Sequence, residues 1–272
     1  KKHLFFQLFH STDNLMRTGQ MPSSSQELRI KSRKKAVISL SAAEKSKAIE
    51  SVLDILPGSL ILNSSPVITL EFCTMLNNYS GVKIISEEER GFTKILAWGE
   101  DRSGLFASLA AGLADLNVKI VTANAYTLKD SRVMDVFHIT DHNDQALLEK
   151  NHLNRIKAQL NKILTNTLDV NVENTINPDI LMRALPVSVK QHESAGHNVT
   201  AIEVVAADRK GLLATLASAL LSEELVLKGV SASTFGEKAV DMFFLVSKNG
   251  ARLSAQQTSG VIDRLKAVAR ID

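Results

Sequence analysis

One short motif occurs twice in the second half of the chain, and its residues are suited to binding a small charged ligand. The motif Asp-Arg-x-Gly-Leu stands at residues 101–105 and again 107 positions later, at residues 208–212. Its aspartate can accept hydrogen bonds from a ligand's ammonium group or from the free amides at a helix start. Its glycine lacks a side chain, so a ligand or a neighbouring backbone can approach closely. The motif can therefore bind a zwitterion, or it can cap the helix and allow close packing, or it can do both.

The residues around each motif predict the elements that must position it. Short apolar runs at residues 95–98 and 202–206 indicate a buried strand before each motif. Leucines at helical spacing follow each motif and predict a helix directly after the loop. Two further strands joined by a polar turn come next, and then a second helix, at about residues 145–164 and 254–268.

The two copies agree over enough residues to indicate a duplicated fold unit. After one residue is lost in the hairpin, Asp135 and Phe137 correspond to Asp241 and Phe243. The order strand, helix, strand, strand, helix is the beginning of a ferredoxin-like βαββαβ unit. We expect residues 168–173 to supply the closing strand of the first unit.

The motif, the leucines after it and the hairpin ending in Asp-x-Phe resemble the ACT domain. This family consists of small ferredoxin-like modules that bind amino acids and regulate the enzymes that carry them. The tandem copies, with residues 232–243 in the second, resemble more specifically the C-terminal region of the enzyme family that adds uridylyl groups to the nitrogen-regulatory PII protein and removes them. The resemblance implies glutamine or another small amino acid as the effector and PII as a partner of the whole enzyme. It implies Mg²⁺ only for catalytic domains upstream, and no cofactor in this chain.

In ACT domains the effector binds at the loop between the first strand and the helix, usually where two units meet. The resemblance therefore implies ACT–ACT pairing, within one chain or between copies. It assigns effector binding to both motifs and to the start of the second strand. These positions are Asp101, Arg102, Ser103, Gly104, Leu105, Lys119, Asp208, Arg209, Lys210, Gly211 and Leu212.

The sequence departs from the family pattern at four of the positions around these sites. Ser103 and Lys210 replace the proline that usually precedes the loop glycine, so the loop backbone is less restrained. Lys119 and Val226 replace an asparagine that commonly contacts the ligand. Because Val226 cannot form a side-chain hydrogen bond, the sequence leaves open whether the second unit binds an effector.

The expected fold class is α+β, with two tandem ferredoxin-like ACT domains preceded by a helical connector. We expect the connector, formed by the end of an upstream hydrolase domain and a linker, at residues 1–90. The first ACT domain is expected at residues 91–176, a linker at 177–198, and the second ACT domain, possibly lacking its closing strand, at 199–272.

Composition excludes several classes of protein. The net charge of +3 and the basic run at residues 31–35, which is expected to form a solvated helix face, give little support to nucleic-acid binding. A single cysteine, Cys73, argues against a disulfide framework and fits a reducing cytoplasm, where we expect the protein. No apolar run approaches the roughly 20 residues of a membrane span. We expect no metal site, because the polar loop at residues 192–198 offers no obvious third or fourth ligand.

No catalytic motif is recognisable in the sequence. It has no Gly-Ser followed by paired aspartates, no clustered His-Asp pair, no phosphate-binding loop and no Gly-x-Ser-x-Gly turn. Catalysis of the parent type is therefore expected upstream of Lys1, and the chain is expected to be a fragment of a longer protein. Three interpretations stay open: a glutamine-sensing region of the PII-modifying enzyme, the regulatory tail of another amino-acid-controlled enzyme, or an ACT pair that binds no effector and only packs or dimerises.

Overall fold

A computed structural model describes residues 23–42, 45–168, 186–192, 199–221 and 225–270. The chain divides into two compact units. One contains the helices up to residue 79 together with the turn at residues 128–131, and the other contains a β-sheet with its covering helices. Among the described residues no helix is both long and apolar enough to cross a bilayer.

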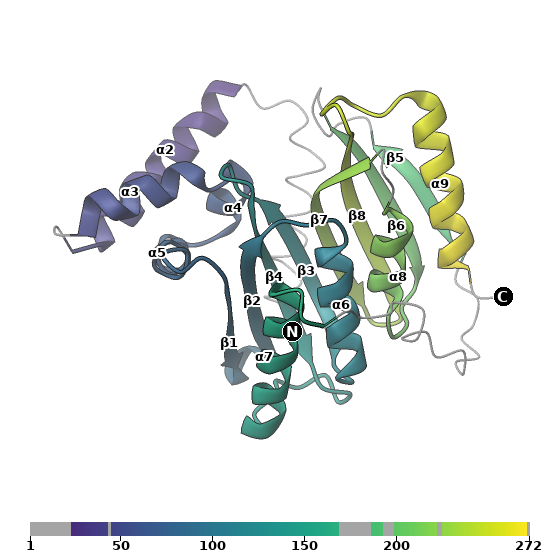
Figure 1. Cartoon of the computed structure of the whole chain (residues 1–272), viewed down its shortest axis with the longest axis horizontal. Coiled ribbons are helices and arrows are strands. Elements are labelled where there is room, and N and C mark those ends of the chain that lie inside the picture. Colours follow the sequence, from purple (N-terminus) through teal and green to yellow (C-terminus); the bar gives the residue numbers. More distant parts are fainter. Residues whose placement is uncertain (1–22, 43–44, 169–185, 193–198, 222–224, 271–272) are drawn as a thin grey trace. The chain divides into compact units, whose positions relative to one another are not determined.

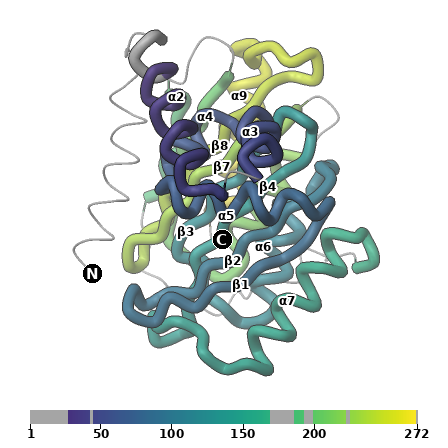
Figure 2. Tube along the Cα trace, turned by 90° about the vertical axis from the view of Figure 1, so that its left-hand side faces the viewer, coloured from purple at the N-terminus to yellow at the C-terminus, as the bar shows by residue number. Residues whose placement is uncertain are grey.

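The described part of the first unit contains four helices, seen among the purple and blue turns in Figure 2. They are α2 (Ser23–Leu40), α3 (Ser46–Ile55), α4 (Gly58–Asn63) and α5 (Pro66–Met75). Helix α2 contacts the other three. These helices lie within the stretch expected to form the helical connector, and Pro57 is the extended N-cap residue of α4. Cys73 is buried in this unit. The start of the expected connector, residues 1–22, lies outside the described residues.

The second unit holds both repeats in one eight-stranded antiparallel sheet (Figure 1). We call the elements from β1 to α7 the first repeat and those from β5 to α9 the second repeat. The first repeat comprises β1 (Gly81–Glu87), the short 3-10 helix η2 (Glu88–Arg90), β2 (Phe92–Glu100), α6 (Leu105–Asp115), β3 (Lys119–Thr127), β4 (Arg132–Thr140) and α7 (Lys150–Leu164). The second comprises β5 (Ser188–His192), β6 (Thr200–Ala207), α8 (Leu212–Ala219), β7 (Leu225–Phe235), β8 (Lys238–Ser247) and α9 (Ala255–Ala269).

The α+β class with tandem ferredoxin-like units is confirmed, but each edge strand comes from an unexpected part of the chain. The strand order is β1-β2-β4-β3-β7-β8-β6-β5. Strand β1 pairs with β2, and β5 pairs with β6, so the outer strand of each repeat precedes the others in sequence. Strand β1 lies within the stretch predicted as connector, residues 1–90, and β5 within the predicted linker, residues 177–198. The predicted closing strand at residues 168–173 falls almost wholly outside the described residues.

A buried threonine in each repeat holds the stretch that precedes the last helix. The hydroxyl of Thr93 accepts a hydrogen bond from the backbone amide of Leu147 at 2.9 Å, and that of Thr200 accepts one from Leu253 at 3.0 Å. These bonds hold the residues before the helix in an extended conformation. Helix α7 consequently starts at Lys150, five residues after the predicted start.

The two repeats meet where β3 and β7 pair. Asn124 pairs with Ser231, and these two residues occupy equivalent positions of the duplication. Both strands also carry a register shift at the same place, after Ile120 and after Leu227. A pairing that matches equivalent residues in an antiparallel ladder relates the repeats by an approximate twofold axis at the junction.

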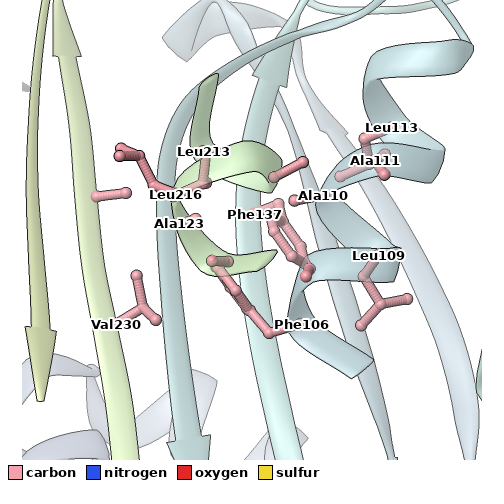
Figure 3. Packing of buried hydrophobic residues seen from close by; sticks show 14 of the residues in the cluster. Phe106, Leu109, Ala110, Ala111, Leu113, Ala123, Phe137, Leu213, Leu216 and Val230 are labelled. Atoms are coloured by element: carbon pink, nitrogen blue, oxygen red, sulfur yellow. The ribbon is translucent and has the colours of Figure 1, made fainter. Parts of the chain in front are cut away.

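One hydrophobic core runs under both repeats. Helices α6 and α8 contact each other on the sheet, flanked by α7 and α9. Figure 3 shows Phe137 of β4 facing Phe106 of α6, with α8 side chains of the second repeat beside them. The two phenyl rings lie 5.7 Å apart between centroids. The core of either repeat is therefore incomplete without the other.

Removing the central phenyl ring of either repeat is expected to destabilise the chain strongly. Phe137 and Phe243 are both fully buried. Each change to Ala should cost about 3–5 kcal/mol of the free energy of unfolding, because it deletes buried apolar contacts and leaves a cavity. Urea denaturation measures this cost. Phe235→Ala, at a hairpin position that is 36% exposed, is the control and should cost less than either core change. Equal losses in all three variants would contradict the proposed shared core.

Candidate functional site

Two cavities lie at the junction of the repeats, and each is lined by both of them. The Asp101 pocket, about 320 Å³, combines the motif loop of the first repeat, residues 101–105, with the start of β7, residues 225–229. The Asp208 pocket, about 240 Å³, combines the motif loop of the second repeat, residues 208–212, with the start of β3. The approximate twofold axis thus places each motif loop beside the second strand of the opposite repeat.

The glycine of each motif, not the aspartate, caps the helix. Gly104 and Gly211 are the N-cap residues of α6 and α8, with φ of 80° and 78°. The carbonyl of Gly104 accepts the first helical bond from Ser108 at 2.9 Å, and that of Gly211 accepts one from Thr215 at the same distance. The predicted N-cap role of the aspartates is therefore wrong. A left-handed backbone favours glycine here for steric reasons, in addition to any need for ligand access.

The motif aspartates lie at the pocket walls, where they are free to interact with a ligand. Asp101 is exposed at the rim of its pocket, and its carboxylate accepts a bond from the backbone amide of Arg102. Asp208 is half-buried and bonded in the same way to Arg209. Burial raises the pKa of Asp208 to about 6, although the positive charge of Lys119 opposes the rise.

The motif arginines line the pockets but direct guanidinium nitrogens to a helix end. Arg102 Nη2 donates to the carbonyl of Ile163 at 2.9 Å, in the last turn of α7. Arg209 donates to the carbonyls of Val268 and Ala269 at 2.7 and 3.2 Å, in the last turn of α9. A cation at a helix C-terminus satisfies free carbonyls and complements the helix dipole. This contact explains the arginine in both motifs without a ligand.

The remaining predicted positions fall into three environments. Ser103 and Lys210 are exposed on the motif loops, whereas Leu105 and Leu212 are buried in the shared core and also line the pockets. Lys119 lines the Asp208 pocket of the opposite repeat and forms a 3.0 Å ion pair with Asp144.

The structure also shows which motif loop Val226 faces. Its lack of a side-chain hydrogen bond had left open whether the second unit binds an effector. Val226 lies in the Asp101 pocket, beside the loop of the first repeat, and not beside its own loop. The loop of the second repeat faces Lys119 instead. The loss of a side-chain hydrogen bond at Val226 therefore concerns the first motif.

Two further aspartates, which we did not predict as site residues, line the pockets from strands of the sheet. Asp135 of β4 lies in the Asp101 pocket and is 2% exposed, and Asp241 of β8 lies in the Asp208 pocket and is 3% exposed. Burial raises the pKa of Asp241 to about 8, and the negative charge of Asp208 adds to the rise. Burial and Asp101 raise the pKa of Asp135 well above its ordinary value in the same way.

The sequence contained a signal for these residues. Asp135 and Asp241 are equivalent in the duplication, and each is a charged residue two positions before a core phenylalanine in an apolar strand. The described residues hold no group of three or more His, Cys, Asp or Glu side chains placed to bind a metal ion. Each pocket instead pairs a loop carboxylate with a buried strand carboxylate, an arrangement that favours a proton or a cationic group.

Comparison with known proteins gives one consistent result. No protein-family model matches the chain. The chain is 31% identical over 185 residues to the bifunctional uridylyltransferase/uridylyl-removing enzyme of Vibrio parahaemolyticus, across 68% of the chain and 21% of that protein. The enzyme of the same name from Vibrio atlanticus is 26% identical over 273 residues, across 97% of the chain and 31% of that protein. The one from Gluconobacter oxydans is 31% identical over 172 residues, across 61% of the chain and 18% of that protein. The chain thus spans about a fifth to a third of the length of these relatives.

Asp241→Asn is expected to change how stability depends on pH. Between the ordinary pKa of 3.8 and the folded pKa of about 8, the folded chain holds a proton that the unfolded chain has lost. This proton makes stability fall as pH rises through that window, by up to about 1.4 kcal/mol per pH unit. The asparagine variant should lack this contribution, as urea denaturation at pH 5, 6, 7 and 8 would show.

Asp263→Asn, at an exposed position of α9, is the control and should follow the wild type. A decline with pH in Asp241→Asn as steep as in the wild type would contradict the assignment of a buried, protonated carboxyl group.

Proposed function

Because this chain is homologous to a segment of the bifunctional uridylyltransferase/uridylyl-removing enzymes, we propose that it is the amino-acid-sensing regulatory region of such an enzyme. We propose glutamine as the effector, and control of uridylyl addition to PII and removal from it as the outcome. The observation that carries this proposal is the pair of pockets at the junction of the repeats.

The pockets have the groups that an amino acid requires at its two charged ends. Asp101 and Asp208 supply carboxylates for an ammonium group. The starts of α6 and α8 supply free backbone amides and the positive end of a helix dipole for a carboxylate. The walls formed by α6 and α8 carry small alanine side chains, so a short side chain of the effector has room between the helices. They are Ala107 and Ala217 in the Asp101 pocket and Ala110, Ala114 and Ala214 in the Asp208 pocket.

The two pockets are related by the duplication but differ in their chemistry. The Asp208 pocket has Lys119 and Lys210 at its wall. The Asp101 pocket has Val226 and Ser103 at the equivalent places. The Asp101 pocket has a lysine at a different place, Lys228, where the Asp208 pocket has Val121, so an anionic end of the effector would meet differently arranged cations in the two pockets. The two pockets are therefore expected to bind one effector with unequal affinities.

A ligand in either pocket contacts both repeats, and this gives binding a route to regulation. Such a ligand favours the arrangement of the repeats that closes its pocket most tightly. Any activity elsewhere in the protein that depends on that arrangement then changes with effector concentration, by the coupling free energy between the sites.

Calorimetric titration of the purified chain tests the proposal directly. Glutamine should give binding heat, and glutamate and a panel of other amino acids should give less. Gly104→Val and Gly211→Val should each remove the heat from one pocket. A Cβ at Gly104 would lie 3.2 Å from Leu221 Cδ1, a residue of the pocket wall.

Gly91→Val and Gly250→Val are the matched controls. Both glycines have the same left-handed backbone, with φ of 75° and 79°, but an added Cβ meets no atom within 4 Å. They should carry a similar backbone strain, of about 1–2 kcal/mol, and bind normally. If all four variants lose binding together, strain and not pocket occupancy explains the loss.

In the longer protein, glutamine is expected to shift the balance between uridylyl addition to PII and uridylyl removal from it. The change Gly211→Val should make both activities insensitive to glutamine while leaving each measurable, as assays with radiolabelled UTP and PII would show. If Gly104→Val and Gly211→Val both retain the full glutamine response, the sensor lies outside these pockets.

A second candidate function is structural packing without an effector. The continuous sheet and the shared core favour it, because they need no ligand to hold the repeats together. A folded chain that gives no heat with any amino acid would support this alternative. Binding of another amino acid in preference to glutamine would instead point to the regulatory region of a different amino-acid-controlled enzyme.

A further inference from the structure

The Asp101 pocket has a buried carboxylate for which the structure provides no partner. Asp135 is 2% exposed and lines this pocket, and no hydrogen bond to its side chain is found among the described residues. In the ladder it lies between Ala97 of β2 and Ala125 of β3, whose methyl groups offer it no polar contact. Its equivalent, Asp241, differs because it accepts a hydrogen bond from the backbone of Ser233. A buried polar group without a partner is costly, and such groups are concentrated at functional sites.

The same pocket also has a buried donor without a partner. Arg102 Nε has no hydrogen-bond acceptor among the described residues, although Nη2 of the same guanidinium bonds to Ile163. Arg102 and Asp135 both line this cavity, and a guanidinium together with a carboxylate match the two charged ends of a zwitterion.

We propose that Asp135 is the specificity-determining residue of the Asp101 pocket, where it accepts the ammonium group of the effector and releases its own proton to solvent on binding. This inference rests on the proposed amino-acid-sensing function and identifies the part of the effector that is recognised. The carboxyl O–H bond breaks, the proton goes to the buffer, and N–H groups of the ammonium replace it as donors to the carboxylate.

The charges around Asp135 are consistent with this exchange. Among the described residues that line the pocket, Asp101, Arg102 and Lys228 are charged, and the phenol of Tyr126 is the other ionisable group. Burial of the site and the negative charge of Asp101 raise the pKa of Asp135 well above its ordinary value, which favours a carboxyl group that holds a proton in the free pocket. Lys228 is exposed, and its charge favours the ionised form of Asp101. An arriving cation replaces the proton in compensating two close carboxylates.

Calorimetry in two buffers measures the released proton. Glutamine is titrated into the whole chain at pH 7 in phosphate and in HEPES, whose heats of ionisation differ. The wild type should release close to one proton per ligand at this site, and its affinity should rise as the pH is raised from 6 to 7.5, because protons compete with the ligand. N-acetylglutamine, which lacks the ammonium group, should bind at least tenfold more weakly.

Variants assign the effect to one carboxylate. Asp135→Asn should weaken glutamine binding to the Asp101 pocket at least tenfold and abolish the proton release from this pocket, because the neutral amide has no proton to exchange. Asp241→Asn, the equivalent change in the other pocket, and Asp263→Asn, on the surface of α9, should leave the release from this site unchanged. Loss of the release in Asp241→Asn alone, or equal binding of glutamine and N-acetylglutamine, would overturn the inference while leaving effector binding intact.

A second measurement does not depend on glutamine. Methylammonium chloride should raise the thermal midpoint of the wild type above that in equal sodium chloride, and should not do so for Asp135→Asn. If glutamine gives no heat but methylammonium stabilises the chain through Asp135, the proposed effector is wrong and the cation site holds. If methylammonium has no effect on the wild type either, the inference is overturned. The thermal unfolding curve of Asp135→Asn also shows whether the variant is folded.

Discussion

The pairing of β3 with β7 is the interaction on which the rest of the sheet-bearing unit depends. It joins two four-stranded halves into one antiparallel sheet and aligns equivalent residues, Asn124 with Ser231. This alignment brings α6 against α8, so their alanines pack together over a shared core. It also places the start of each second strand beside the opposite motif loop, which creates the two pockets. Neither pocket can form from one repeat alone.

The duplication supplies the same backbone to both pockets, and a few side chains then make them different. Both loops have a left-handed glycine before the helix and an arginine bonded to the end of the repeat's last helix. These features set the loop geometry. The differences lie at positions that the backbone leaves free, such as Lys119 in one pocket and Val226 in the other. Chemical divergence is therefore possible without a change in fold.

Buried carboxylates in such pockets reduce stability, since ionisation in a desolvated site is unfavourable. Asp135 and Asp241 are nevertheless present at equivalent positions, each two residues before a fully buried phenylalanine. A packing role does not require a carboxylate, because an apolar residue would fill the site at lower cost. Their presence is more readily explained by interaction with a cation or a proton than by folding.

Local sequence patterns were sufficient for most of the individual elements. Apolar runs and leucine spacing indicated β2, β6, α6 and α8, and the polar turn predicted between the next two strands joins β3 to β4 and β7 to β8. Errors arose where a distant residue competes with local preference. The stretch before α7 is extended because Thr93, more than fifty positions away, holds Leu147. The aspartates do not cap the helices, because the glycine three residues later already does so.

The sequence by itself determined the duplication, the α+β class and the residues of the motif loops, since these follow from periodicity and from the conformational freedom of glycine. Only the tertiary structure decided that the edge strands β1 and β5 come first, that Lys119 faces the loop of the other repeat, and that Asp135 opens into a pocket. These facts depend on strand pairing across long separations in the chain. Alternation along one strand shows which face a residue occupies, but it does not show which strand or loop lies opposite.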